Sequence, residues 1–454
     1  MSKKTAVLAA AAMIALAALA REHRDVILFI GDGMSVPQRM VAEEFSRKAG
    51  LGPLAMNTMP VQAATRTCSL SSLVTDSAAA ATAIACGEKT VNGAVGVDKN
   101  GKRLESCAEV AKKAGMRVGI ITSVTINHAT PAGFYAHRSH RSDLYGIGLD
   151  LLDSGFDLFM GGGLAGANEK KDSPGYKGNL YDLAAEKGWL VLEGPEGFDE
   201  LKDKEGPNPV WWRSGEQAMP YAIDGKDSSP RLPELVECAI ERLHNMDTDS
   251  PGFFLMVEGG RIDWAGHANE AAENMRDILE LDAAVKVALD FQMDHPETLV
   301  IVTGDHETGG MSMGFAGTGY AFYMERLASQ TCSIDAFKDR YHALKNREGG
   351  CTFDEVKSLL AECFGFKFEG DIKDDPMVVV KKDVDSFKRH FKEGGLTDKA
   401  RRLMQEKAGV GWTSGSHTGL PALTTSSGPG SERLSGLLDN TDIAIFIKDI
   451  VRGR

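Results

Sequence analysis

Short apolar runs alternate along most of the chain with longer segments in which apolar residues recur at helical spacing. A continuous apolar run is typical of a strand covered on both faces, and regular alternation with helices is typical of a parallel sheet. We therefore predict an α/β fold with a large, mostly parallel central sheet and helices on both faces. The predicted strands span residues 26–30, 61–65, 118–124, 156–160, 253–257 and 299–303, and the predicted helices span residues 36–48, 77–86, 106–114, 233–245, 269–291 and 442–451.

Two regions depart from this alternation. Glycine and proline gather between residues 194 and 230, which indicates irregular connections. Between about residues 315 and 410, Lys, Glu, Asp and Phe recur at helical spacing and strand patterns are scarce. We expect this second region to be a helical insertion, a crown or lid, carried by one α/β domain that spans residues 21–454.

Residues 1–20 have the pattern of an export signal. Lys3 and Lys4 are followed by an apolar stretch over residues 6–19, which ends in the small-x-small sequence Ala18-Leu19-Ala20. The stretch is too short and too rich in alanine for a convincing transmembrane helix, and no cysteine follows the expected cleavage point. We therefore predict a signal peptide, a periplasmic or secreted protein, and no membrane anchor.

Composition narrows the range of partners. With 51 basic and 64 acidic side chains the net charge is -13, and an acidic surface disfavours nucleic acids and anionic membranes. The 7 cysteines cannot all pair; Cys332 and Cys351 lie at a plausible loop distance, but the sequence leaves the pairing open. No C-x-x-C motif is present, so a zinc site made of cysteines has no support.

A single serine opens a strongly helix-prone stretch. Ser77 follows Asp76 and precedes an alanine-rich run, and Ser or Asp at a helix start caps amide groups left unpaired there. The hydroxyl of Ser77 would lie beside those amides and the positive end of the helix dipole, where a phosphoryl group binds well. Taken alone, the pair is more often a plain helix cap.

Polar side chains follow four predicted strands, at the end where ligands bind in open α/β sheets. Asp263 and His267 stand four residues apart and would face the same way on a helical turn. Imidazole and carboxylate ligands suit zinc, and the many oxygen ligands leave room for magnesium. The residues concerned are Asp32, His128, Thr130, Glu258, Asp263, His267, Asp305 and His306.

These motifs, in this order, resemble those of the alkaline phosphatases. The resemblance covers the chain from about residue 26 to the end and is loose over residues 165–230 and 315–410. No single motif would be specific, but the ordered set is. The motifs are Ile30-Gly31-Asp32-Gly33-Met34, Asp76-Ser77-Ala78-Ala79, Val257-Glu258-Gly259 with Asp263 and His267, Gly304-Asp305-His306, and Ser416-His417-Thr418-Gly419.

The resemblance implies an enzyme that hydrolyses small phosphate monoesters through a covalent phosphoserine at Ser77, with two zinc ions and a third metal, Mg2+. It also implies that Arg141 clamps the phosphate. The implied ligands are Asp263, His267 and His417 for the first zinc, Asp32, Asp305 and His306 for the second, and Asp32, Thr130 and Glu258 for the third ion.

Two positions near the third metal depart from the best-known enterobacterial members, which have an aspartate and a lysine there. This chain has His128 and Trp264, a combination that resembles the marine bacterial branch. We place these two residues and Asp76 around the ligands, where side chains tune the choice of metal. The identity of the third ion therefore stays open.

Three alternatives remain. A phosphodiesterase or a sulfatase of the same superfamily would keep the metal frame but typically lacks the third site and the arginine, so Thr130, Glu258 and Arg141 argue against both. An exported metal- or phosphate-binding protein without turnover is disfavoured by the serine.

If the chain forms a homodimer, we expect the insertion at 315–410 to be its interface or an entrance lid.

Overall fold

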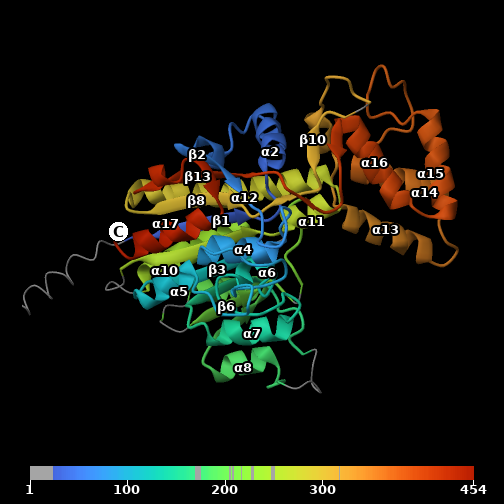
Figure 1. Cartoon of the computed structure of the whole chain (residues 1–454). Helices are drawn as coiled ribbons and strands as arrows, with labels where there is room; N and C mark the ends of the chain where they lie inside the picture. Colours follow the sequence, from blue (N-terminus) through green and yellow to red (C-terminus); the bar gives the residue numbers. More distant parts are fainter. Residues whose placement is uncertain are drawn as a thin grey trace, which may run out of the picture.

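A ten-stranded sheet forms the centre of the molecule (Figure 1). The order of its strands is β14-β2-β13-β8-β1-β7-β3-β4-β6-β5. The computed structural model describes residues 24–168, 175–203, 206, 209–215, 217–225, 230–246, 251–315 and 317–454, so the predicted signal peptide lies outside the described residues. The strands of the sheet are β1 (Val26–Gly31), β2 (Val61–Arg66), β3 (Arg117–Thr125), β4 (Leu158–Gly162), β5 (Leu190–Glu193), β6 (Val210–Arg213), β7 (Phe253–Gly259), β8 (Leu299–Gly304), β13 (Ala422–Ser427) and β14 (Gly436–Asp439).

Neighbouring strands in this sheet run parallel, except that β13 is antiparallel to both β2 and β8. A mostly parallel sheet has to be covered on both faces, which explains why its strands read as continuous apolar runs. The predicted fold class is confirmed.

Alternate residues of β1 enter two separate hydrophobic cores. Ile27 and Phe29 belong to one core, and Val26, Leu28 and Ile30 belong to the other. Successive side chains of a strand point to opposite faces, so the cores lie on the two sides of the sheet. The first core is covered by α2 (Val36–Lys48), α3 (Ala55–Thr58), α9 (Gly194–Asp203), α10 (Leu232–Asn245), α11 (Arg261–His267) and α12 (Ala271–Asp294), and the second by α4 (Ser77–Cys86), α5 (Cys107–Lys113), α6 (Ala129–Ala132), α7 (Leu144–Asp153), α8 (Leu180–Glu186) and α17 (Thr441–Val451).

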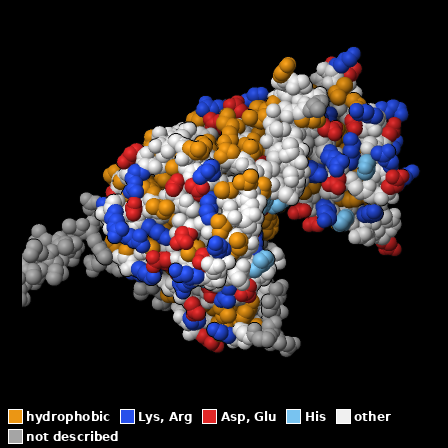
Figure 2. Space-filling view, in the orientation of Figure 1, with side chains coloured by type: hydrophobic (Ala, Val, Ile, Leu, Met, Phe, Trp, Pro, Cys, Tyr) orange, Lys and Arg blue, Asp and Glu red, His pale blue; other side chains and the backbone are white. Residues whose placement is uncertain are grey.

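A helical lobe projects from one end of the sheet (Figure 1). The chain enters it through β10 (Met311–Met313) and leaves it through β11 (Val410–Trp412), and these two short strands pair antiparallel at its base. Figure 2 shows the lobe as a separate mass with acidic and basic side chains mixed over its surface. Its helices are η1 (Met324–Ser329), α13 (Ile334–Asn346), α14 (Phe353–Phe364), α15 (Lys381–Glu393) and α16 (Leu396–Ala408).

The sequence pattern does not predict β5, β6, β13 or β14. Because β6 and α9 lie within residues 194–230, the expectation of irregular connections there is wrong in part. Strands of four residues, such as β5 and β6, carry too little periodicity to separate them from loops. Across the described part of the chain, no helix combines the length and the apolar character needed to cross a bilayer.

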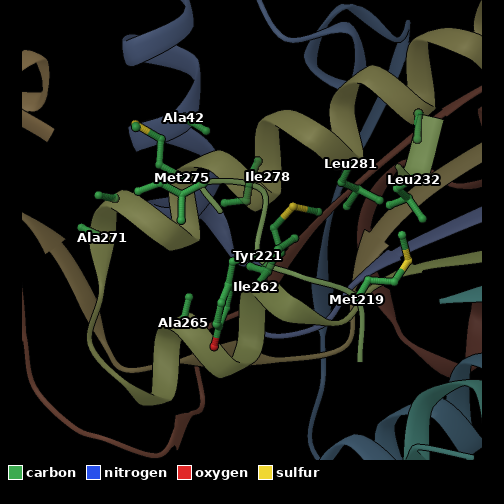
Figure 3. Close-up of a cluster of buried hydrophobic side chains, with 14 of the residues drawn as sticks. Ala42, Met219, Tyr221, Leu232, Ile262, Ala265, Ala271, Met275, Ile278 and Leu281 are labelled. Atoms are coloured by element: carbon green, nitrogen blue, oxygen red, sulfur yellow. The ribbon is translucent and has the colours of Figure 1, made fainter. Parts of the chain in front are cut away.

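The packing of α11 against α12 fixes the direction of the short helix that carries two predicted metal ligands. Ile262 and Ala265 on α11 are fully buried and lie close to Tyr221 and to Met275 and Ile278 of α12 (Figure 3). A seven-residue helix is too short to be stable alone, so this apolar contact holds it in place.

Two buried carboxylates join the lobe to α12. The backbone N–H of Ile334, the first residue of α13, donates to Glu273, and Gln405 Nε2 of α16 donates to Glu270 Oε1 at 3.1 Å. Both glutamates are fully buried. Burial raises the pKa of Glu270 from 4.5 to about 7, although hydrogen bonds from Gln330 and Gln405 lower it in part. Burial and the negative charge of Glu270 together raise the pKa of Glu273.

A raised carboxyl pKa means that the folded chain binds the proton more tightly than the unfolded chain. The resulting stability is present below the unfolded pKa of about 4.3. It is lost as pH rises through the folded pKa, which for Glu270 is about 7. We predict that Glu273→Gln is close to the parent at pH 4 and more stable by about 1–3 kcal/mol at pH 8, because it removes one buried charge. Urea unfolding at both pH values measures this, with the exposed Glu393→Gln as control; an equal effect at both pH values would contradict the prediction.

Candidate metal centre

Strand register brings three carboxylates together at one edge of the sheet. Gly31 at the end of β1 is paired with Gly259 of β7 and with Gly304 of β8. Asp32 and Asp305 each follow directly, and neighbouring strands are about 4.8 Å apart. Glu258 lies one residue earlier on β7, opposite Ile30. The register of the parallel strands is therefore sufficient to place these three carboxylates close together.

The first cluster is Asp32, Asp305 and His306, whose side chains are fully buried. His306 Nε2 lies 3.4 Å from Asp32 Oδ1 and 3.2 Å from Asp305 Oδ2. The other oxygen of Asp305 accepts the backbone N–H of Gly33 at 3.0 Å, which fixes the carboxylate plane. Ser77 Oγ lies 3.2 Å from the same imidazole nitrogen.

The second cluster is Asp263, His267 and His417. Each imidazole turns its Nδ1 to a carbonyl, that of Gly415 at 2.8 Å and that of Thr75 at 2.9 Å, and a carbonyl can only accept a hydrogen bond. Nδ1 therefore carries the proton, and each Nε2 lone pair points inward. The two Nε2 atoms are 3.1 Å apart, and each lies 3.5 Å from a carboxylate oxygen of Asp263. This is the tautomer that a metal ligand requires.

The third cluster combines Asp32, Glu258 and His128. Thr130 Oγ1 donates to Asp32 Oδ2 at 3.3 Å, and Thr122 donates to Glu258 from the neighbouring strand β3. The predicted set for the third ion holds Thr130 and Glu258, and the structure adds the ring of His128 to the same group. Trp264 stacks edge-on to that ring with centroids 6.1 Å apart, so both departures from the family pattern lie at this cluster.

The donor sets fit metal ions. In each cluster the three donor atoms lie within 4.8 Å of one another. Asp32 Oδ1, Glu258 Oε1 and Asp305 Oδ2 are buried and have no hydrogen-bond partner within the part of the chain that the structure describes. A buried carboxylate oxygen without a donor is costly unless a cation neutralises it.

The electrostatics point the same way. Burial and the neighbouring carboxylates raise the pKa of Asp32 well above its usual value, and burial raises the pKa of Glu258 to about 7. Burial, together with the neighbouring His417 and Arg141 side chains, lowers the pKa of His306 far below its usual range, and burial lowers that of His128 to about 3. The acids therefore repel one another while both imidazoles stay neutral, which is the condition of a site made for cations.

The helix that begins at Ser77 completes the site. Asp76 caps α4, with Oδ1 accepting the N–H of Ala79 at 3.0 Å. Its other oxygen lies 3.3 Å from Arg141 Nη1, and Arg141 Nη2 lies 3.3 Å from His128 Nε2. One side chain thus caps the helix and holds the guanidinium beside Ser77, at the positive end of the helix dipole.

Two residues that the sequence analysis does not single out, Glu307 and Thr308, follow the Asp305-His306 pair. Thr308 Oγ1 donates to Asp263 Oδ1 at 2.5 Å and lies 3.3 Å from His306 Nδ1, so it connects two clusters. Adjacency to Asp305-His306 is the only sequence signal for it. Gly33 packs here with a φ of 72°, and a Cβ on it would lie 2.8 Å from Thr308 Oγ1.

Glu307 is a buried carboxylate with a structural role. It accepts Gln38 Nε2 at 2.5 Å, the N–H groups of Gly310 at 2.9 Å and Met311 at 3.1 Å, and the hydroxyl of Thr418. The last contact joins β9 (Glu307–Thr308) to β12 (His417–Thr418). Glu307 therefore keeps His417 in register with the other ligands.

Comparison with known proteins identifies what this arrangement is similar to. A family model described as alkaline phosphatase matches residues 23–452. Alkaline phosphatase 4 of Bacillus subtilis (strain 168) is 31% identical over 453 residues, which cover 95% of this chain and 89% of that protein.

Solved structures are similar over nearly their whole length. The cold-active alkaline phosphatase from a psychrophilic Shewanella sp. has a TM-score of 0.81 and 26% identity, covering 94% of this chain and 99% of that one. A mutant of the alkaline phosphatase from the Antarctic bacterium TAB5, with Mg bound in its M3 site, has a TM-score of 0.66 and 25% identity, covering 95% and 99%.

Removal of metal should destabilise the protein more at high pH than at low pH. Without cations, the raised carboxyl pKa values favour folding in acid, and this contribution is lost as pH rises through about 7, the pKa of Glu258. With cations bound, the same carboxylates stay ionised as ligands. We therefore predict that a chelator lowers the melting temperature more at pH 9 than at pH 6. Differential scanning calorimetry with chelator already saturated with zinc is the control, and equal shifts at both pH values would refute the prediction.

Thr308 should matter through its hydroxyl. Thr308→Val keeps the volume and removes the hydrogen bond to Asp263, so we predict a loss of about 10–100-fold in metal affinity, as is typical for groups that orient ligands. Thr308→Ser keeps the hydroxyl and serves as the matched control. Competition with a metal buffer measures the affinity, and an equal loss in both variants would show that the hydroxyl does not orient the ligand.

Proposed function

The chain belongs to the alkaline phosphatase family, and we propose that it hydrolyses phosphate monoesters through a covalent phosphoserine at Ser77, with two zinc ions and a third metal ion. It is a phosphatase by its relatives and fold. One observation carries the mechanistic proposal: Ser77 Oγ lies at the start of α4 and 3.2 Å from the imidazole nitrogen of a buried cluster of cation ligands.

Three sets of side chains would hold the metals. We assign one zinc to Asp263, His267 and His417 and the other to Asp32, Asp305 and His306. For the third ion we assign Asp32, Thr130 and Glu258 to magnesium. Mg occupies the M3 site of the TAB5 enzyme in a mutant in which a histidine is replaced by glutamate. The alternative is a softer ion such as zinc, because the ring nitrogen of His128 in this cluster is a ligand that suits zinc better than magnesium. When bound, such cations lower the pKa of coordinated hydroxyl groups and water and neutralise negative charge on phosphate oxygens.

The residues of the chain would divide the remaining work. The planar guanidinium of Arg141 binds two phosphate oxygens, and Asp76 and His128 hold it in position. The amide groups at the start of α4 face the same anion.

Ser77 Oγ attacks phosphorus in line with the leaving oxygen, the P–O bond to Ser77 forms as the P–O bond to the alcohol breaks, and the alcohol leaves with the proton that the Ser77 hydroxyl gives up. Water then attacks the phosphoserine, which releases phosphate and restores the hydroxyl.

Several features of the site argue against the alternatives. Arg141 and the third cluster match monoester chemistry, in which a terminal phosphate presents three free oxygens to bind. A sulfate ester or a phosphodiester presents less charge to a site with this many cation ligands. A pure binding protein would have no use for a serine hydroxyl at hydrogen-bond distance from a ligand imidazole.

We also propose that residues 1–20 direct the protein to the periplasm or outside the cell, on the pattern of Lys3, Lys4 and the apolar stretch that follows. The homodimer considered from the sequence stays a prediction.

The test compares three substrates and one variant. We predict chelator-sensitive turnover of an aryl phosphate monoester that exceeds turnover of an aryl phosphate diester and an aryl sulfate. Ser77→Ala should lose at least about a thousandfold in kcat and form no phosphoenzyme, because the nucleophile is gone. Its zinc content should stay at the parent level, and Ser358→Ala, at an exposed position of α14, is the control. Equal turnover in Ser77→Ala would refute the mechanism, and faster diester or sulfate turnover would refute the substrate class.

A further inference from the structure

Two cysteines meet inside the helical lobe, far from the metal ligands in the chain. Cys332 directly precedes Ser333, the residue that caps α13, and Cys363 lies in the last turn of α14. Their side chains are within hydrogen-bonding reach of each other. Both belong to the same hydrophobic core.

Backbone contacts fix the two segments side by side. Thr331 N–H donates to the carbonyl of Cys363 at 2.9 Å, and Thr331 Oγ1 donates to the carbonyl of Glu362 at 2.9 Å. Cys332 is the next residue after Thr331, so these main-chain hydrogen bonds hold the two cysteines next to each other. A disulfide needs Cα atoms within about 7 Å, which a hydrogen-bonded pair of segments provides.

Cys351 cannot take the same place. It lies just before Thr352, the cap at the start of α14, whereas Cys363 lies at the end of that helix. Twelve residues of α-helix span about 18 Å, so a thiol that touches Cys363 is far from Cys351. The loop distance between Cys332 and Cys351 in the sequence therefore does not correspond to a contact in the fold.

We propose that Cys332 and Cys363 form a disulfide that closes the lobe on itself. The proposal does not depend on the phosphatase mechanism, because neither cysteine belongs to the metal clusters.

The environment of the pair suits thiol–disulfide exchange. Arg340 Nη1 lies 3.3 Å from Cys363 Sγ, and a guanidinium stabilises a thiolate. Because this guanidinium contacts Cys363, we assign Cys363 as the attacking thiolate and Cys332 as the thiol that closes the disulfide. By contrast, Cys107 is buried on the other face of the sheet, where burial raises its pKa to about 12.

The chemistry balances with a disulfide as the oxidant, either a small molecule such as oxidised glutathione or the disulfide of an oxidoreductase. The Cys363 thiolate attacks one sulfur of the oxidant, forms a mixed disulfide and releases a thiolate. Cys332 then loses its proton, attacks the sulfur of Cys363 and displaces the second thiolate. Two protons and two electrons leave the cysteine pair, and the oxidant is reduced to two thiols.

The bond would join the end of α14 to a segment already attached to the main domain. Ser333 N–H donates to Asp224 at 2.7 Å, and Ile334 N–H donates to Glu273 of α12. A covalent link next to these contacts would tie α13 and α14 to the base of the lobe. We therefore expect oxidation to raise the melting temperature of the chain by several degrees.

The experiment folds the full chain with oxidised glutathione or with a reducing agent, then maps peptides by mass spectrometry without reduction. We expect a peptide pair linked through Cys332 and Cys363, about 2 Da lighter than the two thiol peptides together. The rise in melting temperature should vanish in Cys332→Ser and remain in the control Cys351→Ser.

Other results would overturn the proposal. Free thiols at both positions after oxidative folding, glutathione adducts alone, or a link from Cys332 to Cys351 would each exclude the disulfide. A linked chain that melts at the same temperature as the reduced chain would show that the bond does not close the lobe. Phosphatase activity is measured in parallel, so that failure of the proposed function is seen separately.

Discussion

Mutual repulsion among buried carboxylates is the constraint on which the rest of this structure depends. Asp32, Glu258 and Asp305 are held within one small volume because three adjacent parallel strands end in register. No arrangement of neutral side chains compensates several such charges, whereas cations do. The sheet therefore has to be rigid, since a slip of one residue would send each acid to the opposite face. The apolar runs of β1, β7 and β8, buried on both sides, supply that rigidity.

Each ligand outside these strands is positioned by a separate element, and a different set of contacts stabilises each of these elements. Asp263 stands on α11, which is held by apolar contacts to α12 (Figure 3). His417 is held by the pairing of β12 with β9, for which Glu307 collects four donors. Ser77 begins a buried helix whose cap, Asp76, also orients Arg141. Asp76 thus links the start of α4 to Arg141, and Thr308 connects the cluster that contains Asp263 to the cluster that contains His306.

The sequence was sufficient for the parts of the site that are local in the chain. Asp32 and Asp305 follow strongly apolar strands, so their place at the sheet edge could be read from the pattern alone. By contrast, β13 reads as Ala-Leu-Thr-Thr-Ser-Ser, yet Thr424 and Thr425 are fully buried, and Thr424 exchanges hydroxyl hydrogen bonds with Thr65 and Thr303. Hydrophobic patterning misses a strand whose buried side chains satisfy one another by hydrogen bonds. The role of Glu307 and the contact between Cys332 and Cys363 depend on tertiary pairing, which no local pattern encodes.

The position of the lobe explains how a large insertion can coexist with a site of this precision. The lobe is inserted in the sequence after Asp305-His306 and before His417. The ligands on its two sides are therefore distant in sequence, although they must stay close together in space. Movement of the lobe would displace His417 unless its two ends were clamped. The pairing of β10 with β11 joins the ends at the base, and the pairing of β9 with β12 makes a second clamp on the metal side. Two short ladders and one buried glutamate therefore hold both ends of the lobe, and His417 with them, against the main domain.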